Sequence, residues 1–214
     1  CSSDLENVAN TRVTFKGDKF YLSDGATGPR VGSIFAVKDY PEKTHCTMFD
    51  ELNLPVDMIV THSFTPINSN WMAGRIKRMM KMRASANDGA FSLMDELPTA
   101  LDDLESKRLS FGDHHMTVAV FADSEEQLSN IGGEIKNTAS TEGVNLVAEG
   151  FASGTHYFAQ HPGNAHARSR KGAVTNRNFA DFAAFHRTPL GKDRDQLPWG
   201  KVISMFPTPE SSAF

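Results

Sequence analysis

Between residues 31 and 151 the sequence alternates strand-like and helix-like segments, with two long helical segments between the second and third strands. Val31 and Phe35 follow the two-residue apolar period of a strand, whereas Leu128, Ile131 and Ile135 follow the longer period of a buried helix stripe. The predicted strands span 31–40, 56–64, 114–121 and 144–147, and the predicted short helices span 47–54 and follow Ser124. Two strand-helix-strand halves in one domain predict an α+β class fold with a ferredoxin-like split βαβ sheet.

The two long helical segments form a predicted helical hairpin over residues 67–108, inserted between the second and third strands. The first helix carries an apolar stripe and only basic charges; the second carries a leucine stripe and only acidic charges. We expect the basic helix to face the acidic one, although exposed ion pairs contribute only about 0–1 kcal/mol each. Pro98 is expected to kink the second helix or to begin a new one.

The flanking segments predict two further parts of the chain. Residues 1–30 contain apolar alternation around Gly17-Asp18, which predicts a β-hairpin followed by a flexible joint. Residues 152–214 predict a helical and loop-rich tail, with a short helix at Phe179, Phe182 and Phe185 and a strand at 202–206. The predicted boundaries are therefore 1–30, 31–151 and 152–214.

Composition narrows the class of protein. Of the 214 residues, 39% are hydrophobic, and the formal charge of −4 argues against a dedicated nucleic-acid binder, which usually carries a basic face. Two cysteines make neither a disulfide framework nor a zinc knuckle, which predicts a reducing cytoplasm. No apolar run approaches the roughly 18 residues of a membrane span. The chain does not begin with Met, so we expect a piece of a longer protein.

A phosphate-binding loop requires a glycine-rich turn followed by Lys and Ser or Thr. Gly191-Lys192 is followed by Asp193, and Gly200-Lys201 is followed by Val202, so neither pair fits this pattern. We therefore expect no ATP or magnesium site and no catalytic residue within this chain.

Histidines supply two further candidate sites. Even spacing of His156, His161 and His166 suggests metal ligands, but on a helix that step rotates each ligand by about 140°. The second candidate is a catalytic group made of Asp113, His114, His115, His62 and Ser63. Neighbours on a strand point to opposite faces, which separates Asp113 from His114. We expect neither a metal site nor catalysis, and a metal-dependent hydrolase remains an alternative.

The first helix of the hairpin is the best candidate for binding. It carries more methionine than its apolar stripe requires, and methionine forms adaptable protein-contact surfaces. The predicted protein-contacting residues are Trp71, Arg75, Arg78, Met79, Met82 and Arg83. A nucleic-acid-binding module is the alternative, because Arg75, Lys77, Arg78, Lys81 and Arg83 could follow phosphates; the acidic charge of the whole chain and of the second helix argues against direct DNA contact.

Six short motifs occur in an order and spacing that resemble one known family. They are Lys38-Asp39-Tyr40-Pro41, Ser63-Phe64-Thr65-Pro66, Phe111-Gly112-Asp113-His114-His115, Pro162-Gly163-Asn164, Arg177-Asn178-Phe179-Ala180 and Pro198-Trp199-Gly200. From about residue 11 to 206 the chain resembles the CagE/TrbE/VirB family of type IV secretion, or conjugal transfer, ATPases.

The resemblance implies a hexameric ATPase at the cytoplasmic face of the bacterial inner membrane, working in pilus biogenesis and in transfer of DNA or protein. It implies that ATP and magnesium bind a motor domain that follows the matched region. This chain would then be a non-catalytic assembly and coupling module. The implied partners are inner-membrane components of the secretion system, the motor domain and neighbouring subunits.

Overall fold

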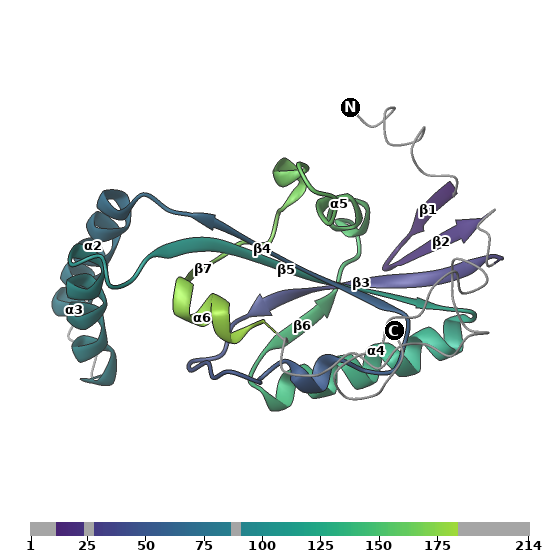
Figure 1. Ribbon diagram of the computed structural model, residues 1–214, viewed down its shortest axis with the longest axis horizontal. Coiled ribbons are helices and arrows are strands. Elements are labelled where there is room, and N and C mark those ends of the chain that lie inside the picture. Colours follow the sequence, from purple (N-terminus) through teal and green to yellow (C-terminus); the bar gives the residue numbers. More distant parts are fainter. Residues whose placement is uncertain (1–11, 24–27, 87–90, 184–214) are drawn as a thin grey trace, which may run out of the picture.

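The computed structural model describes residues 12–23, 28–86 and 91–183 as a mixed α/β structure built on one antiparallel sheet (Figure 1). The strands are β1 (Arg12–Lys16), β2 (Lys19–Ser23), β3 (Arg30–Asp39), β4 (Met58–Pro66), β5 (Phe111–Ala122), β6 (Asn145–Ala148) and β7 (Gly172–Thr175). The helices are α2 (Ser69–Ala86), α3 (Phe91–Glu105), α4 (Glu125–Thr141), α5 (Ser153–Ala159) and α6 (Asn176–Asp181), with 3₁₀ turns η1 (Asp50–Leu52) and η2 (Ala165–Ala167). Among the described residues, no helix is both long and apolar enough to cross a membrane.

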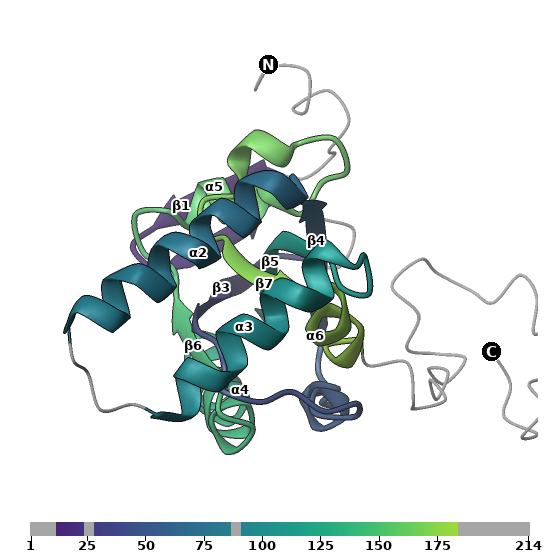
Figure 2. The ribbon, with the colours of Figure 1, turned by 90° about the vertical axis from the view of Figure 1, so that its left-hand side faces the viewer.

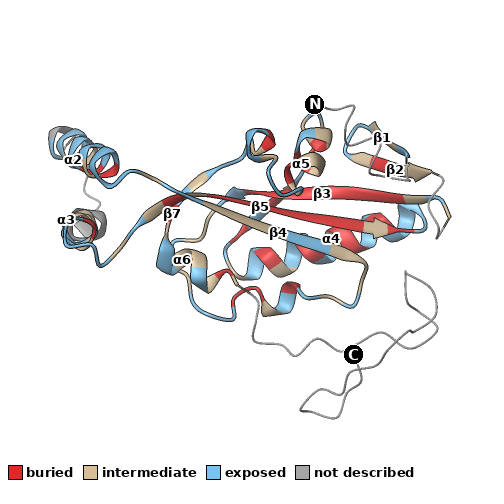
Figure 3. Ribbon diagram, turned by 45° about the horizontal axis from the view of Figure 1, so that its top comes forward, coloured by how far each residue is buried: buried red, intermediate tan, exposed pale blue. Residues whose placement is uncertain are grey.

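The sheet is organised around the pairing of β3 with β5. Its strand order is β1-β2-β3-β5-β4, with β6 also paired to β3 and β7 also paired to β5. Every pair is antiparallel. One face of β3 and β5 packs against α4 through residues such as Phe35, Val118 and Ile135. The opposite face carries a smaller cluster of Phe20, Ile34 and Ala119, so the central strands are buried on both sides (Figure 3).

The predicted β-hairpin and the helix after Ser124 are confirmed, and α2 and α3 lie within the range of the two expected long helical segments. Gly17 has a positive φ of 64° in the turn between β1 and β2, and the Ser124 side chain accepts a hydrogen bond from the Gln127 backbone N–H at the start of α4. The turn expected at Asn87-Asp88-Gly89 lies outside the described residues. Pro98 lies inside α3, which continues from Phe91 to Glu105, so the predicted new helix start is wrong.

The predicted helix at 47–54 is wrong. The structure has only the 3₁₀ turn η1 in this segment, and Thr47 adopts a positive φ of 79°, which a right-handed helix does not allow. Burial of Met48, Phe49 and Leu52 holds the segment against the main core instead. Tertiary packing therefore determines the conformation of this segment, although its apolar residues have the spacing of a helix.

Both predicted domain boundaries fall within the one sheet. β2 pairs with β3 across the first boundary, and β7 pairs with β5 although it belongs to the predicted tail. Phe179 and Phe182 lie in and just after α6, whereas Phe185 and the predicted strand at 202–206 lie outside the described residues. Independent folding of the three parts stays a prediction.

Four of the family-like motifs meet around the start of β5. The Tyr40 hydroxyl lies 2.9 Å from His114 Nδ1, and the Phe64 ring stacks on Phe179 with ring centroids 4.8 Å apart. The Phe64 ring also lies against Gly112, where a Cβ atom would come within 2.3 Å of it. The motifs therefore share one structural role, which is to pack β3, β4, β5 and α6 together.

Each face of β5 carries one pair of histidines. On the face of Tyr40, His62 Nδ1 lies 3.1 Å from His114 Nε2; on the other face, His115 Nε2 lies 3.1 Å from His156 Nδ1. Burial lowers the pKa of His62 to about 4 and that of His115 to about 4. Burial, with the nearby His62 and His115, lowers the pKa of His114 to about 3, and burial also lowers the pKa of His156. These rings are therefore neutral members of the core at pH 7.

Replacing Gly172 by alanine should destabilise the fold. A Cβ atom there would lie 2.2 Å from the Tyr40 ring, which is itself held by His114, so the contact can be relieved only by moving packed groups. We expect Gly172→Ala to lower the free energy of unfolding by roughly 1–3 kcal/mol in a urea titration. The matched control is Gly133→Ala in α4, where a Cβ atom meets nothing within 4 Å and alanine should be neutral or stabilising. Equal stability of the two variants would contradict this packing.

The histidine pairs should make stability fall on mild acidification. Below pH 6.5 the unfolded chain binds protons at these histidines, whereas the folded chain does not until about pH 4, so the free energy of unfolding decreases across that window. Each buried histidine contributes up to about 1.4 kcal/mol per pH unit there and nothing above it. Urea titrations from pH 7 to 4.5 should show a smaller slope for His114→Gln than for the unaltered chain. Gly133→Ala, which keeps every histidine, should leave the slope unchanged.

Candidate protein-interaction surface

The helical hairpin is held together by its own apolar seam. Met72 and Ile76 on α2 pack with Leu104 on α3, and all three are buried. Ile67 and Phe111 join this cluster where the chain enters and leaves the hairpin. The Asn68 side chain accepts hydrogen bonds from the backbone N–H groups of residues 70 and 71 and so caps the start of α2. The predicted stripe of Met72, Ile76 and Met80 thus faces α3.

The hairpin lies at one end of the sheet, beyond the ends of β4 and β5, and away from α4 and α5 (Figure 1). Viewed from that end, α2 and α3 lie side by side in front of the sheet (Figure 2). Among the side chains that the structure describes, no residue of the main core cluster comes from the hairpin, which has a separate cluster of its own. Its outer surface is therefore presented at the extremity of the molecule.

Trp71, Arg75, Arg78 and Met82 form a single stripe along the outside of α2. Their spacing of i, i+4, i+7 and i+11 places them on one helix face. Trp71 is 58% exposed and Met82 is 66% exposed, which is unusual for side chains of this size. The Arg75 guanidinium lies over the Trp71 ring, 5.6 Å from its centroid, and so keeps part of the indole covered.

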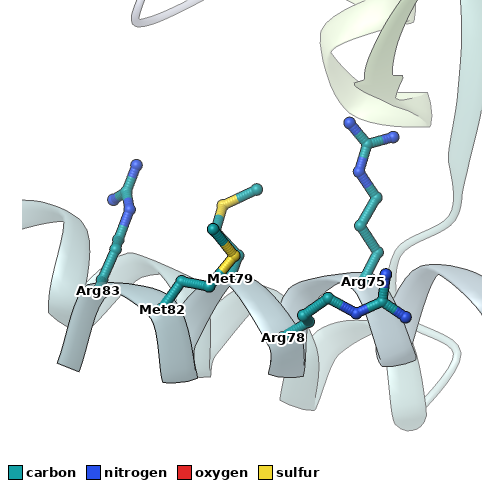
Figure 4. A pocket seen from close by; sticks show the side chains of 5 residues that line it. All are labelled: Arg75, Arg78, Met79, Met82 and Arg83. Atoms are coloured by element: carbon teal, nitrogen blue, oxygen red, sulfur yellow. The ribbon is translucent and has the colours of Figure 1, made fainter. Parts of the chain in front are cut away.

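Two depressions follow this stripe and share Arg75 and Arg78. One of about 390 Å³ is lined by Asn70, Trp71, Gly74, Arg75 and Arg78. The other, of about 480 Å³, is lined by Arg75, Arg78, Met79, Met82 and Arg83 (Figure 4). Arg75 and Arg83 rise at its two ends, with Met79 between them (Figure 4). We call this feature the α2 groove; its floor is apolar and its rim is cationic.

All six residues predicted to contact protein line the α2 groove, so the structure brings them together on one surface. Their role in binding stays a prediction. We expected the basic helix to face the acidic one. Among the described residues, one ion pair joins α2 to α3, that of Lys77 with Glu105 at 2.8 Å, so contact between the two charged faces is limited to this pair. Asp102 and Asp103 pair instead with Arg108, which follows α3. The described contacts between α2 and α3 are therefore mainly apolar.

The histidines predicted as an alternative metal site do not converge. His156 is fully buried, whereas His161 and His166 are exposed. In the described part of the chain, no group of three or more His, Cys, Asp or Glu side chains is placed to hold a metal ion. As expected for strand neighbours, His114 and His115 point to opposite faces of the sheet, toward Tyr40 and His156 respectively.

Sequence reasoning missed the polar network around His156. Its Nε2 atom lies 2.9 Å from Ser169 Oγ and 3.6 Å from a Glu149 oxygen, and Glu149 also pairs with Arg170. In a hydrolytic triad the carboxylate must orient the ring from the nitrogen opposite the serine. Here serine and carboxylate share one nitrogen, so this network satisfies buried polar groups rather than activating Ser169. The spacing of the sequence contains no signal for it, because its members come together only through the fold.

Residues 2–170 match a family model. Its description is "CagE, TrbE, VirB family, component of type IV transporter system". The chain is 35% identical over 210 residues to the type IV secretion system protein virB4 of Bartonella quintana, covering 97% of this chain and 26% of that relative. It is 33% identical to the virB4 protein of Bartonella henselae, covering 86% of this chain and 24% of the relative.

The type IV secretion system protein PtlC of Bordetella pertussis is 28% identical and matches 86% of this chain and 22% of its own length. The chain spans about a quarter of the length of these relatives. The family model covers well over half of the chain. Its matched residues include strands β1 to β6 and end just before β7. The chain therefore belongs to the CagE, TrbE, VirB family, whose members are components of type IV transporter systems.

Proposed function

We propose that this chain is an assembly and coupling module of a type IV secretion ATPase, and that the α2 groove is its protein-binding surface. The observation that carries the proposal is the exposed Trp71 and Met82 on a hairpin placed beyond the sheet. Large exposed apolar side chains that gather with arginine are typical of contact surfaces. The similarity to secretion system proteins named virB4 and PtlC supports the proposal that this contact is made within a type IV secretion system.

In this proposal the chemistry lies in another part of the protein. ATP and magnesium bind a motor domain, and the present chain transmits its work to components of the inner membrane from the cytoplasmic face. The matched relatives are about four times longer than this chain, which leaves room for such a domain. Neither Gly-Lys pair of the sequence continues as a phosphate-binding loop, which supports a non-catalytic role here.

We also assign the central strands to a ferredoxin-like split βαβ arrangement with the hairpin inserted. The order β6-β3-β5-β4 with antiparallel neighbours supports this assignment. The arrangement departs from that pattern before β4, where η1 stands in place of the first crossover helix. The departure leaves the edge of the sheet near β4 less covered than the face under α4.

Removing the apolar anchors of the α2 groove should weaken secretion without unfolding the chain. Trp71→Ala with Met82→Ala removes two exposed side chains, so the free energy of unfolding should change by no more than about 0.5 kcal/mol. In cells that depend on the full-length protein, transfer of its cargo should fall at least roughly tenfold, as expected when contact-surface anchors are lost. The matched control is Phe151→Ala, which removes another exposed aromatic ring outside the hairpin and should leave transfer unchanged.

Normal transfer by the Trp71→Ala and Met82→Ala variant would contradict the proposal. DNA binding by the chain that weakens steeply with salt, and is lost with Arg75→Ala and Arg78→Ala, would instead support the nucleic-acid alternative.

The chain itself should not hydrolyse ATP. Phosphate release from Mg-ATP in the presence of the purified chain should equal the rate without protein, because neither Gly-Lys pair of its sequence continues as a phosphate-binding loop. Hydrolysis above that background, retained through repeated purification, would show that this reading of the sequence is wrong.

A further inference from the structure

Three carboxylates at the end of α3 are neutralised within the chain. Glu105 pairs with Lys77 of α2 at 2.8 Å. Asp102 and Asp103 pair with Arg108 at 2.5 and 2.7 Å. This end of the hairpin therefore supplies its own cations to its own acidic side chains.

The cations of α2 are not supplied with anions in the same way. Four of them have no ion pair with any carboxylate that the structure describes, namely Arg75, Arg78, Lys81 and Arg83. The 18 residues of α2 include no acidic side chain, and Arg75 lies over the Trp71 ring instead. Positive charge is thus concentrated along one exposed helix, which attracts an anionic partner.

Apolar side chains lie among these cations. Trp71 is 58% exposed and Met82 is 66% exposed, and Met79 lies between Arg75 and Arg83 on the floor of the α2 groove (Figure 4). Tryptophan, methionine and arginine are the side chains that protein-protein contacts concentrate at their centre. The occupant of the groove therefore has to offer apolar side chains as well as negative charge.

We propose that the α2 groove binds an acidic amphipathic helix of another protein. The groove is about 17 Å long from Trp71 to Met82, so a partner helix of roughly three turns, about 11 residues, fills it. In a helix-in-groove contact the partner presents apolar side chains at i, i+3 or i+4, and i+7, here against the indole and the methionines. Carboxylates beside that apolar stripe bind Arg75 and Arg78, whose guanidinium groups can donate two hydrogen bonds to one carboxylate.

The shape and chemistry of the groove favour this helix over other anionic partners. A nucleic acid offers phosphates to the arginines but no aliphatic side chain to Met79 and Met82. A lipid surface is flat, so it would meet the raised Arg75 and Arg83 and leave the depression between them unfilled (Figure 4). This assignment rests on the proposed function, since it names the kind of protein segment that the α2 groove contacts.

Photocrosslinking in cells identifies the occupant. A photoreactive amino acid placed at position 79 of the full-length protein lies on the groove floor. It should crosslink to a segment of a different protein in which Asp or Glu and apolar residues recur at helical spacing. The same amino acid at position 136, an exposed site on α4, is the matched control and should not give this product.

Charge reversal then tests the pairing. Arg75→Glu with Arg78→Glu should lower the yield of the crosslink at least roughly tenfold, because like charges face each other across the contact. Arginine in place of the carboxylates of the crosslinked segment should restore the yield. Lys16→Glu with Lys136→Glu makes the same change in net charge at exposed positions outside the hairpin and should leave the yield unchanged. Circular dichroism of the purified chain confirms that each variant is folded.

The outcomes separate this inference from the proposed function. A product with nucleic acid, with lipid or with a second copy of this protein overturns the acidic helix as occupant. A product with a segment that lacks carboxylates, or a yield that charge reversal does not change, also overturns it and leaves the α2 groove as a protein-binding surface. When charge reversal abolishes the crosslink but cargo transfer stays normal, the acidic helix is the occupant and the proposed coupling role is wrong. When position 79 gives no product while transfer is active, both proposals are wrong.

Discussion

The pairing of β3 with β5 is the contact on which the rest of the structure depends. Both strands are buried on two faces, so each can be covered only if α4 lies on one side and the β1–β2 hairpin and α5 lie on the other. β4, β6 and β7 all attach to this pair rather than to one another. Burial on both faces also explains the run of four consecutive apolar residues from Ile34 to Val37 in β3, where the alternation expected from a half-buried strand is lost.

Local signals predicted most of the elements, because they depend on residues close in sequence. The Gly17 turn, the Ser124 cap and the stripe of Met72, Ile76 and Met80 each act within one turn or helix. The prediction of a helix at 47–54 was wrong because burial of this segment against the main core outweighs the helical spacing of its apolar residues. The pairing of β7 with β5 also depends on tertiary contacts and could not be predicted from the sequence. A four-residue segment is too short to show a strand period, and it forms a strand here because it pairs with β5.

The candidate surface was easier to predict than the histidine networks. An outward helix face follows from the inward one, so Trp71, Arg75, Arg78 and Met82 could be placed as soon as the apolar stripe was known. The link from His115 through His156 to Ser169 joins three separate segments, and no spacing in the sequence predicts it. Four of the motifs that carry the family resemblance belong to this second kind, because they specify packing around β5.

The attachment of the hairpin has a mechanical consequence. β4 and β5 are paired without interruption from Met58 opposite Val120 to Pro66 opposite Gly112, and the hairpin is joined to the far end of both strands. A force that draws the hairpin outward along the strand direction therefore pulls the central strand β5 against β3 lengthwise. The hydrogen bonds of that ladder then share the load and must fail together, whereas a sideways pull would open them one after another. A pull on the hairpin along the strands is thus borne by the ladder in the middle of the sheet.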